Sequence, residues 1–239
     1  MGIISRFPAG ATKPYIEEIY NSDGQLIDVK MYGYETIRDY AFYGCSNLAL
    51  TSLPNGITSI GDKAFENCSN LALTNLPNGI TSIGNSVFSS CSNLALTSLP
   101  NGITSIGDYA FRGCTSLALT SLPSGITIIT YNAFRGCTNL ALTSLPSGIF
   151  IISDNAFRDC TSLALTSLPS GITSIGDNAF RGCTSLVSLT FEGTPDHIEG
   201  GAFDKCNNLT TINVPWAKGA VANAPWGATN ATINYGHTG

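Results

Sequence analysis

Residues 91–114 read CSNLALTSLPNGITSIGDYAFRGC, and this stretch decides the fold. Its apolar residues are Leu94, Leu96, Leu99, Ile103, Ile106, Ala110 and Phe111, followed by Cys114. Their spacing matches neither a continuous helix nor a long alternating strand. Pro100 and Gly102 mark one corner, because proline fixes φ and glycine accepts a positive φ, and Gly107 marks another. The stretch therefore predicts a coil of short straight segments joined by corners.

The same pattern repeats along the chain with a fixed period of 23 residues. Cysteines stand at positions 45, 68, 91, 114, 137, 160, 183 and 206, and a phenylalanine precedes each by three positions. Proline recurs at 54, 77, 100, 123, 146 and 169, with glycine two positions later. Such self-similarity marks a solenoid, in which each turn buries its apolar side chains by stacking on its neighbours.

Each turn is expected to contain two extended pieces. Residues 94–99 predict a short strand, residues 103–106 predict a second one, and residues 108–111 form a helical turn or a further corner. Equivalent strands of successive turns are expected to pair in parallel, roughly 4.8 Å apart, so that about eight turns give a rod on the order of 40 Å long. We expect parallel strands along one face and short strands or helical turns on the other.

The recurring motif is Cys-x-x-Leu, then Leu-Pro, then Ile-x-x-Ile-Gly, then Ala-Phe-x-x-Cys. This motif resembles the BspA-like class of bacterial leucine-rich repeats, and the resemblance covers about residues 31–215. It implies a leucine-rich-repeat solenoid. It also implies a surface-exposed or secreted protein with a role in adhesion and in binding to a host or matrix.

Six turns depart from the usual spacing of this class. The last two turns read Leu-x-x-Leu-x-Phe and Leu-x-x-Ile-x-Val, whereas the earlier six read Leu-Ala-Leu-Thr-Ser-Leu-Pro. A local bulge would turn Leu96 inward and leave Thr97 exposed. The usual register would instead bury Thr97 and expose a stripe of six leucines. We expect the first arrangement, because an exposed leucine ladder invites aggregation.

Both ends of a solenoid need a cap, because the terminal turns expose their core. Asp23-Gly24 lies between two apolar runs, which predicts a capping hairpin over residues 15–32. Trp216 and Trp226 predict a C-terminal cap, with an exposed platform for stacking on carbohydrate as the alternative. We divide the chain into an N-terminal arm and capping hairpin (1–30), about eight leucine-rich-repeat turns (31–214) and a C-terminal cap (215–239).

The cysteines are expected to be free, buried thiols in one interior ladder. Stacked turns would bring neighbouring cysteines within the range of a disulfide. However, an unpaired cysteine often behaves as a small hydrophobe. The paired spacings of a zinc site, such as C-x-x-C, do not occur in the sequence. We therefore expect neither disulfides nor bound metal.

Two ladders of polar residues are the candidate binding sites. The first consists of threonines at equivalent positions: Thr74, Thr97, Thr120, Thr143 and Thr166, preceded by Thr51. Exposed together, they would form a flat, nearly uncharged surface for an extended polymer or a partner protein. The second consists of arginines at equivalent positions: Arg112, Arg135, Arg158 and Arg181. These arginines would bind an anionic ligand, or they would form a solvated face paired with Asp108, Asp154 and Asp177, which is what we expect.

Composition and motifs argue against other functions. Charged residues make up 11 % of the chain and the formal net charge is −5, which disfavours nucleic-acid binding. No apolar run reaches the length of a membrane span, and the start MGIISRFPAG lacks the apolar core of a secretory signal. The histidines, His197 and His237, have no recognisable nucleophile partner, and there is no phosphate-binding loop. We expect no catalytic residue and no cofactor, and we leave the oligomeric state open.

The sequence therefore predicts a non-enzymatic module that binds a protein or a glycan, in an adhesin-like surface or secreted protein. The alternative is a structural spacer or a receptor-binding part of a larger assembly, such as a phage particle or a surface layer. An enzyme is a distant third possibility.

Overall fold

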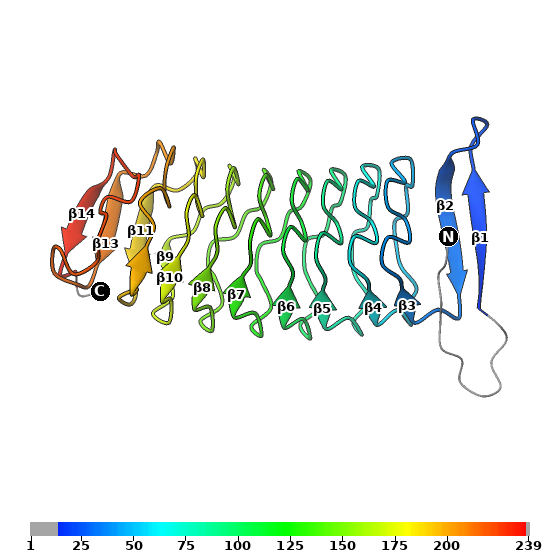
Figure 1. The fold of residues 1–239 in the computed structure, drawn as a ribbon, viewed down its shortest axis with the longest axis horizontal. Coiled ribbons are helices and arrows are strands. Elements are labelled where there is room, and N and C mark those ends of the chain that lie inside the picture. The colour runs from blue at the N-terminus through cyan, green and yellow to red at the C-terminus, as the bar shows by residue number, and fades with distance from the viewer. Residues whose placement is uncertain (1–13, 238–239) are drawn as a thin grey trace.

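The chain winds into a solenoid of about nine turns that stack along one axis, as Figure 1 shows for the computed structural model. The structure describes residues 14–237. Within them no residue is helical, so the predicted turn at residues 108–111 is a corner and not helical. β1 (Tyr15–Tyr20) and β14 (Thr232–Tyr235) lie at opposite ends of the rod.

One row of very short parallel strands runs along most of the rod. Its members are β3 (Thr36–Ile37), β4 (Ser59–Ile60), β5 (Ser82–Ile83), β6 (Ser105–Ile106), β7 (Ile128–Ile129), β8 (Ile151–Ile152), β10 (Ser174–Ile175) and β12 (His197–Ile198). β3 pairs with β4, β5 pairs with β6, and β7, β8, β10 and β12 form one sheet. This row is the second extended piece that the sequence predicts.

The predicted strand over residues 94–99 is wrong for most of the chain. A second parallel row exists only toward the C-terminus, as β9 (Ser167–Leu168), β11 (Ser188–Phe191), β13 (Thr211–Val214) and β14 (Thr232–Tyr235). In earlier turns, the amide of Ala95 donates to the carbonyl of Leu73 at 3.2 Å, but no strand follows. The four-residue strands β11 and β13 therefore lie where the usual repeat spacing returns, and β9, in the last altered turn, has two residues only.

The altered spacing turns its extra leucine into the core, as we expected. Leu96 is fully buried, and Thr97 and Ser98 are exposed. The equivalent leucines of the other five turns, Leu50, Leu73, Leu119, Leu142 and Leu165, are also buried. Leu96 and Leu99 both face the core although two exposed residues lie between them, and this spacing is incompatible with the alternation of a straight strand.

A continuous stack of phenylalanine rings fills one side of the interior. The rings of Phe42, Phe65, Phe88, Phe111, Phe134, Phe157, Phe180 and Phe203 lie 5.2–5.8 Å apart between neighbouring centroids, with interplanar angles of 2–17°. Each ring packs on the turns before and after it. The core is therefore one ladder shared by every turn.

The corner at Gly107 and its equivalents is held by side chains from the preceding turn. The Asp154 carboxylate accepts a hydrogen bond from the backbone amide of Asp177 at 2.9 Å, and Asp62 accepts one from Asn85 at 2.7 Å. A Cβ atom on Gly176 would lie 2.5 Å from the backbone nitrogen of Asp154. Glycine at this position therefore lets successive turns approach closely, whereas Thr130, Ser153 and Glu199 stand at the equivalent position of three other turns.

The two ends are closed differently. β1 (Tyr15–Tyr20) and β2 (Leu26–Tyr32) form the predicted antiparallel hairpin, and the carbonyl of Ile27 in β2 accepts a hydrogen bond from the first turn. The predicted arm falls largely on residues 1–13, which lie outside the described residues. At the other end, Trp216 and Trp226 are buried against Phe191, at centroid distances of 5.2 and 6.1 Å. Their burial supports the cap and contradicts an exposed stacking platform.

Candidate interaction surface

The structure places the predicted threonine row on the surface. Thr74, Thr97, Thr120, Thr143 and Thr166 are all exposed, as is Thr51 before them. We call these six residues the threonine row. Within residues 14–237, none of their hydroxyls makes a hydrogen bond. These hydroxyls are therefore available to a ligand.

A second series of threonines on the rod is different. Thr104 lies just before β6, and its hydroxyl donates to the carbonyl of Thr81 at 3.4 Å. The Thr58 hydroxyl donates to the backbone carbonyl of Glu35 at 3.2 Å, and the Thr173 hydroxyl donates to the backbone carbonyl of Phe150 at 3.0 Å. Each of these bonds links one turn to the turn before it. The donors in this second series therefore serve the fold.

The threonine row borders shallow hollows between turns. One hollow of about 280 Å³ is lined by Asn75, Asn78, Ser98 and Asn101, together with apolar residues of the same two turns. Its polar groups are amides and hydroxyls, without a charge. The surface around the row thus offers neutral hydrogen-bonding groups at the regular spacing of the turns.

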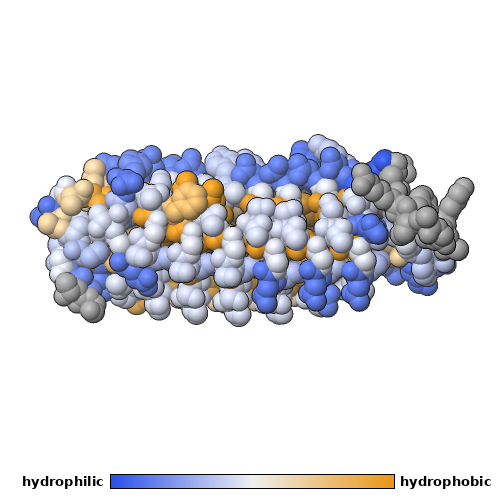
Figure 2. All heavy atoms as spheres, turned by 90° about the horizontal axis from the view of Figure 1, so that it is seen from below, coloured by the Kyte–Doolittle hydropathy of each residue, from blue (hydrophilic) through white to orange (hydrophobic). Residues whose placement is uncertain are grey.

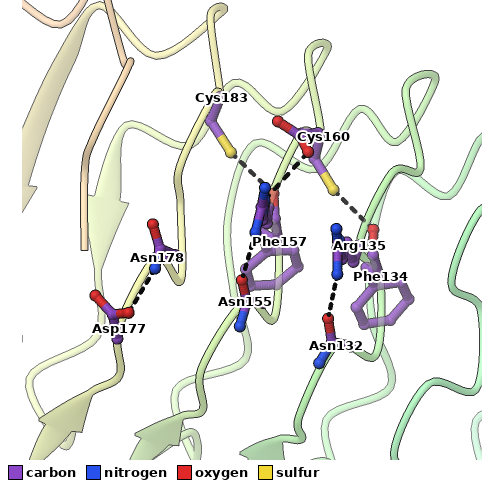
Figure 3. Close-up of polar contacts among 11 residues, drawn as sticks. Asn132, Phe134, Arg135, Asn155, Phe157, Cys160, Asp177, Asn178 and Cys183 are labelled. Atoms are coloured by element: carbon purple, nitrogen blue, oxygen red, sulfur yellow. Dashed lines mark hydrogen bonds and ion pairs between the residues drawn. The ribbon is translucent and has the colours of Figure 1, made fainter. Parts of the chain in front are cut away.

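The arginine row is present, but within the described residues no ion pair joins it to Asp108, Asp154 or Asp177, so that predicted pairing is wrong. Arg135 donates to the Asn132 side chain at 3.4 Å, Arg158 donates to Asn155 at 3.3 Å and also meets Asp159 at 3.3 Å (Figure 3). Arg112 lies over the Tyr109 ring. The side chains of Asp108 and Asp154 instead accept bonds from backbone amides of the next turn.

The charge around the arginine row is balanced. Four arginines share this part of the surface with four carboxylates, at positions 108, 154, 159 and 177. A ligand rich in negative charge would therefore meet no net positive field here. The geometry favours a structural and solvating role for the arginines over an anion-binding stripe.

The cysteines form the expected interior ladder and are free. Seven thiols donate to the carbonyl of the phenylalanine 26 residues earlier, at 2.9–3.1 Å, as Cys160 does to Phe134 in Figure 3. Cys45 differs because it is only half-buried. Burial raises the pKa of the Cys68 and Cys206 thiols to about 12, and it holds the pKa of Cys114 well above its ordinary value.

Alkylation should therefore separate Cys45 from the other cysteines. With iodoacetamide at pH 8, we expect the native protein to gain one adduct, at Cys45, because the buried thiols are neutral and shielded. Unfolded protein should gain eight adducts, one for each free cysteine. Mass spectrometry of both samples measures this. Eight cysteines that stay unlabelled after unfolding would show that the thiols are oxidised.

Because these thiols are buried in the folded protein, we expect the free energy of unfolding to fall in alkaline solution. The folded pKa of Cys68, about 12, exceeds its ordinary value of 9.0. The unfolded chain therefore releases this proton first, so the stabilising contribution is complete below about pH 9 and is lost as pH rises toward 12.

Both histidines lie on the surface of the described part of the chain. His197 is exposed and pairs with Glu199 at 3.0 Å, and His237 is exposed near the end. Among residues 14–237, no cluster of three His, Cys, Asp or Glu side chains could hold a metal ion. The same residues contain no helix that is long and apolar enough to cross a membrane.

One feature of the surface was not predicted from the sequence. Phe150 is 40 % exposed, and Ile128 and Ile151 beside it are only partly buried. In most other turns, these positions hold threonine and serine. The signal was present in the sequence as a local departure from the repeat.

Comparison with known proteins identifies the repeat. The family model for the BspA type leucine rich repeat region matches residues 19–141 and 129–221, with six copies. No curated protein matches the chain. Among solved structures, a leucine-rich repeat protein from Bacteroides ovatus is 23 % identical, with 95 % of this chain and 76 % of that chain covered and a TM-score of 0.57.

Two further structures are more distant in shape. The leucine rich repeat protein of T. pallidum is 27 % identical, with 86 % of this chain and 91 % of that chain covered and a TM-score of 0.48. A leucine rich cell surface protein from Faecalibacterium prausnitzii is 20 % identical, with 97 % of each chain covered and a TM-score of 0.46. The family model spans most of the described residues, and the chain therefore belongs to the BspA type leucine-rich repeat family.

Proposed function

We propose that this chain is a non-enzymatic, adhesin-like interaction module that binds an extended protein segment or glycan along the threonine row. The observation that carries the proposal is the free hydroxyl on each exposed threonine, repeated turn after turn. An extended ligand gains one neutral hydrogen bond per turn on such a surface. Family membership supports interaction as the task of the repeat, and a place at the cell surface or outside the cell belongs to the same proposal.

The threonine row can be tested by removing its hydroxyls without changing its shape. The variant Thr74→Val, Thr97→Val, Thr120→Val and Thr143→Val keeps the side-chain volume. We expect at least about tenfold weaker binding on an array of matrix proteins and glycans, since each hydrogen bond contributes about 0.5–1.5 kcal/mol.

The matched control uses the other series of threonines. The variant Thr58→Val and Thr104→Val removes hydroxyls that bond within the protein, so it should leave ligand binding unchanged and cost a little stability. Equal binding by the wild type and the four-residue variant would contradict the proposal. A wild type that binds nothing on the array would favour the spacer function instead.

A further inference from the structure

Equivalent residues of different turns can be compared directly along the row of short strands from β3 to β12. The two outward residues before the buried isoleucine are threonine and serine in four turns, at 58–59, 81–82, 104–105 and 173–174. Two adjacent turns in the middle of the row carry apolar residues instead, at Thr127-Ile128 and Phe150-Ile151, whereas the turns at its two ends carry Glu35-Thr36 and Asp196-His197. We call Ile128, Phe150 and Ile151 the apolar island.

The three side chains of the island come from neighbouring strands. β7 and β8 pair in parallel with Ile128 opposite Ile151, and the amide of Phe150 donates to the carbonyl of Thr127 at 3.0 Å. Figure 2, which looks from below, shows apolar groups gathered within a mostly pale face, in the half nearer the C-terminal end. The island is thus one contiguous feature that belongs to two turns.

Polar groups border the island. The Thr173 hydroxyl donates to the Phe150 carbonyl at 3.0 Å and so lies in the adjoining turn. Thr130 and Ser153 replace the corner glycine in the same two turns as the island, and the Thr130 hydroxyl donates to the Ile106 carbonyl at 3.0 Å. Hydroxyl oxygens therefore lie in the same two turns as the apolar side chains and in the adjoining turn, and each retains free lone pairs.

From these contacts we propose that the apolar island binds the apolar face of an uncharged glycan that runs along the rod. A hexose presents C–H groups on one face of its ring and hydroxyls around its edge. The C–H face packs on the Phe150 ring with the two isoleucines beside it, as apolar groups pack on aromatic faces. The edge hydroxyls meet the threonine and serine oxygens that border the island.

The size of the island favours a small ligand over a second copy of the chain. Phe150 is 40 % exposed and both isoleucines are partly buried. Together the three side chains offer on the order of 200 Å² of surface, whereas a stable protein interface needs roughly 800 Å² per partner. One or two sugar rings cover an area of this size.

Charge and spacing agree with the same ligand. The outward positions of the strand row between Thr58 and Ser174 hold no charged residue, so they offer nothing to an anionic or cationic polymer. Successive turns repeat at roughly the spacing of parallel strands, about 4.8 Å, which is close to the length of one hexose in an extended glycan. A linear glycan can therefore keep the same register over several turns.

The test uses native gels that contain an uncharged polysaccharide. The chain carries a formal charge of −5 and migrates in such gels, and a protein that binds the polymer is retarded. The probes are hydroxyethyl cellulose, barley β-glucan and a galactomannan, with dextran sulfate as the anionic comparison. We expect retardation of the wild type by at least one of the three neutral polymers.

The decisive variant restores the repeat. Ile128→Ser, Phe150→Thr and Ile151→Ser give the residues that four other turns carry, so the fold is retained. We expect apparent affinity to fall by roughly fivefold or more. Moving the island to β5 and β6 in that background, with Ser82→Ile, Thr104→Phe and Ser105→Ile, should restore retardation, because Ser82 and Ser105 pair as Ile128 and Ile151 do.

Several results would overturn the proposal. They are no retardation of the wild type by any neutral polymer, equal retardation of the restored-repeat variant, or retardation by dextran sulfate alone. A dimer in sedimentation that the restored-repeat variant loses would assign the island to a second copy. The four-residue threonine variant keeps the island and should still be retarded. Loss of retardation in that variant, but not in the restored-repeat variant, would assign the neutral polymer to the threonine row instead.

Discussion

Replacing Phe111 by alanine is expected to lower the free energy of unfolding by about 3–5 kcal/mol. The ring is fully buried and lies between Phe88 at 5.6 Å and Phe134 at 5.5 Å. Alanine leaves a cavity on both sides, and it removes the contact through which the two halves of the rod stabilise each other. Urea unfolding followed by circular dichroism measures the change.

Two further variants show whether the stack itself is responsible. Phe42 has a neighbouring ring on one side, Phe65 at 5.2 Å, so Phe42→Ala should cost less than Phe111→Ala. Tyr131 is exposed, and Tyr131→Ala should change stability by less than about 0.5 kcal/mol. Equal losses for Phe42→Ala and Phe111→Ala would show that coupling between turns adds little.

The second large effect concerns the altered strand. Leu96→Ala should cost about 2–5 kcal/mol because the side chain is fully buried, whereas Thr97→Ala should change stability by less than about 0.5 kcal/mol. The two positions are adjacent and opposite in burial. The same unfolding measurement compares them directly.

The usual repeat register predicts the reverse ranking. If Thr97→Ala costs more than Leu96→Ala, threonine faces the core and leucine faces solvent. Leu189→Ala provides a reference, because Leu189 is buried within the regular strand β11. Its loss should be similar to that of Leu96→Ala.

Much of the fold could be predicted from spacing alone. The 23-residue period requires stacked turns, and the Asp23-Gly24 turn identifies the N-terminal hairpin. The location of the main strand row could not be predicted, because residues 94–99 and 103–106 both have the composition of extended chain. In the altered turns, the bend that buries Leu96 keeps residues 94–99 from forming a regular strand. The main strand row therefore lies at residues 103–106 and their equivalents.

The candidate site was predicted unevenly. Exposure of the threonine row follows from burial of the neighbouring leucine, so both could be predicted together. The pairing of Arg158 could not, because spacing of four residues implies contact only on a helix, and here the corner turns Asp154 toward the next turn. The apolar island could not be predicted from the repeating positions, because Phe150 differs from the threonine that stands at the equivalent position of most other turns.

The hydrogen bond that a corner carboxylate accepts from the next turn has a consequence for how the repeat array can evolve. Asp39, Asp62, Asp108 and Asp154 all accept in this way, and Asn85 does so through its amide oxygen, so most junctions join the same kind of surface. In-frame recombination between two repeats of the gene can therefore lengthen or shorten the rod by whole turns without creating a junction that has not already been selected. The distance between the N-terminal hairpin and any ligand-binding turn can thus evolve separately from the turn itself.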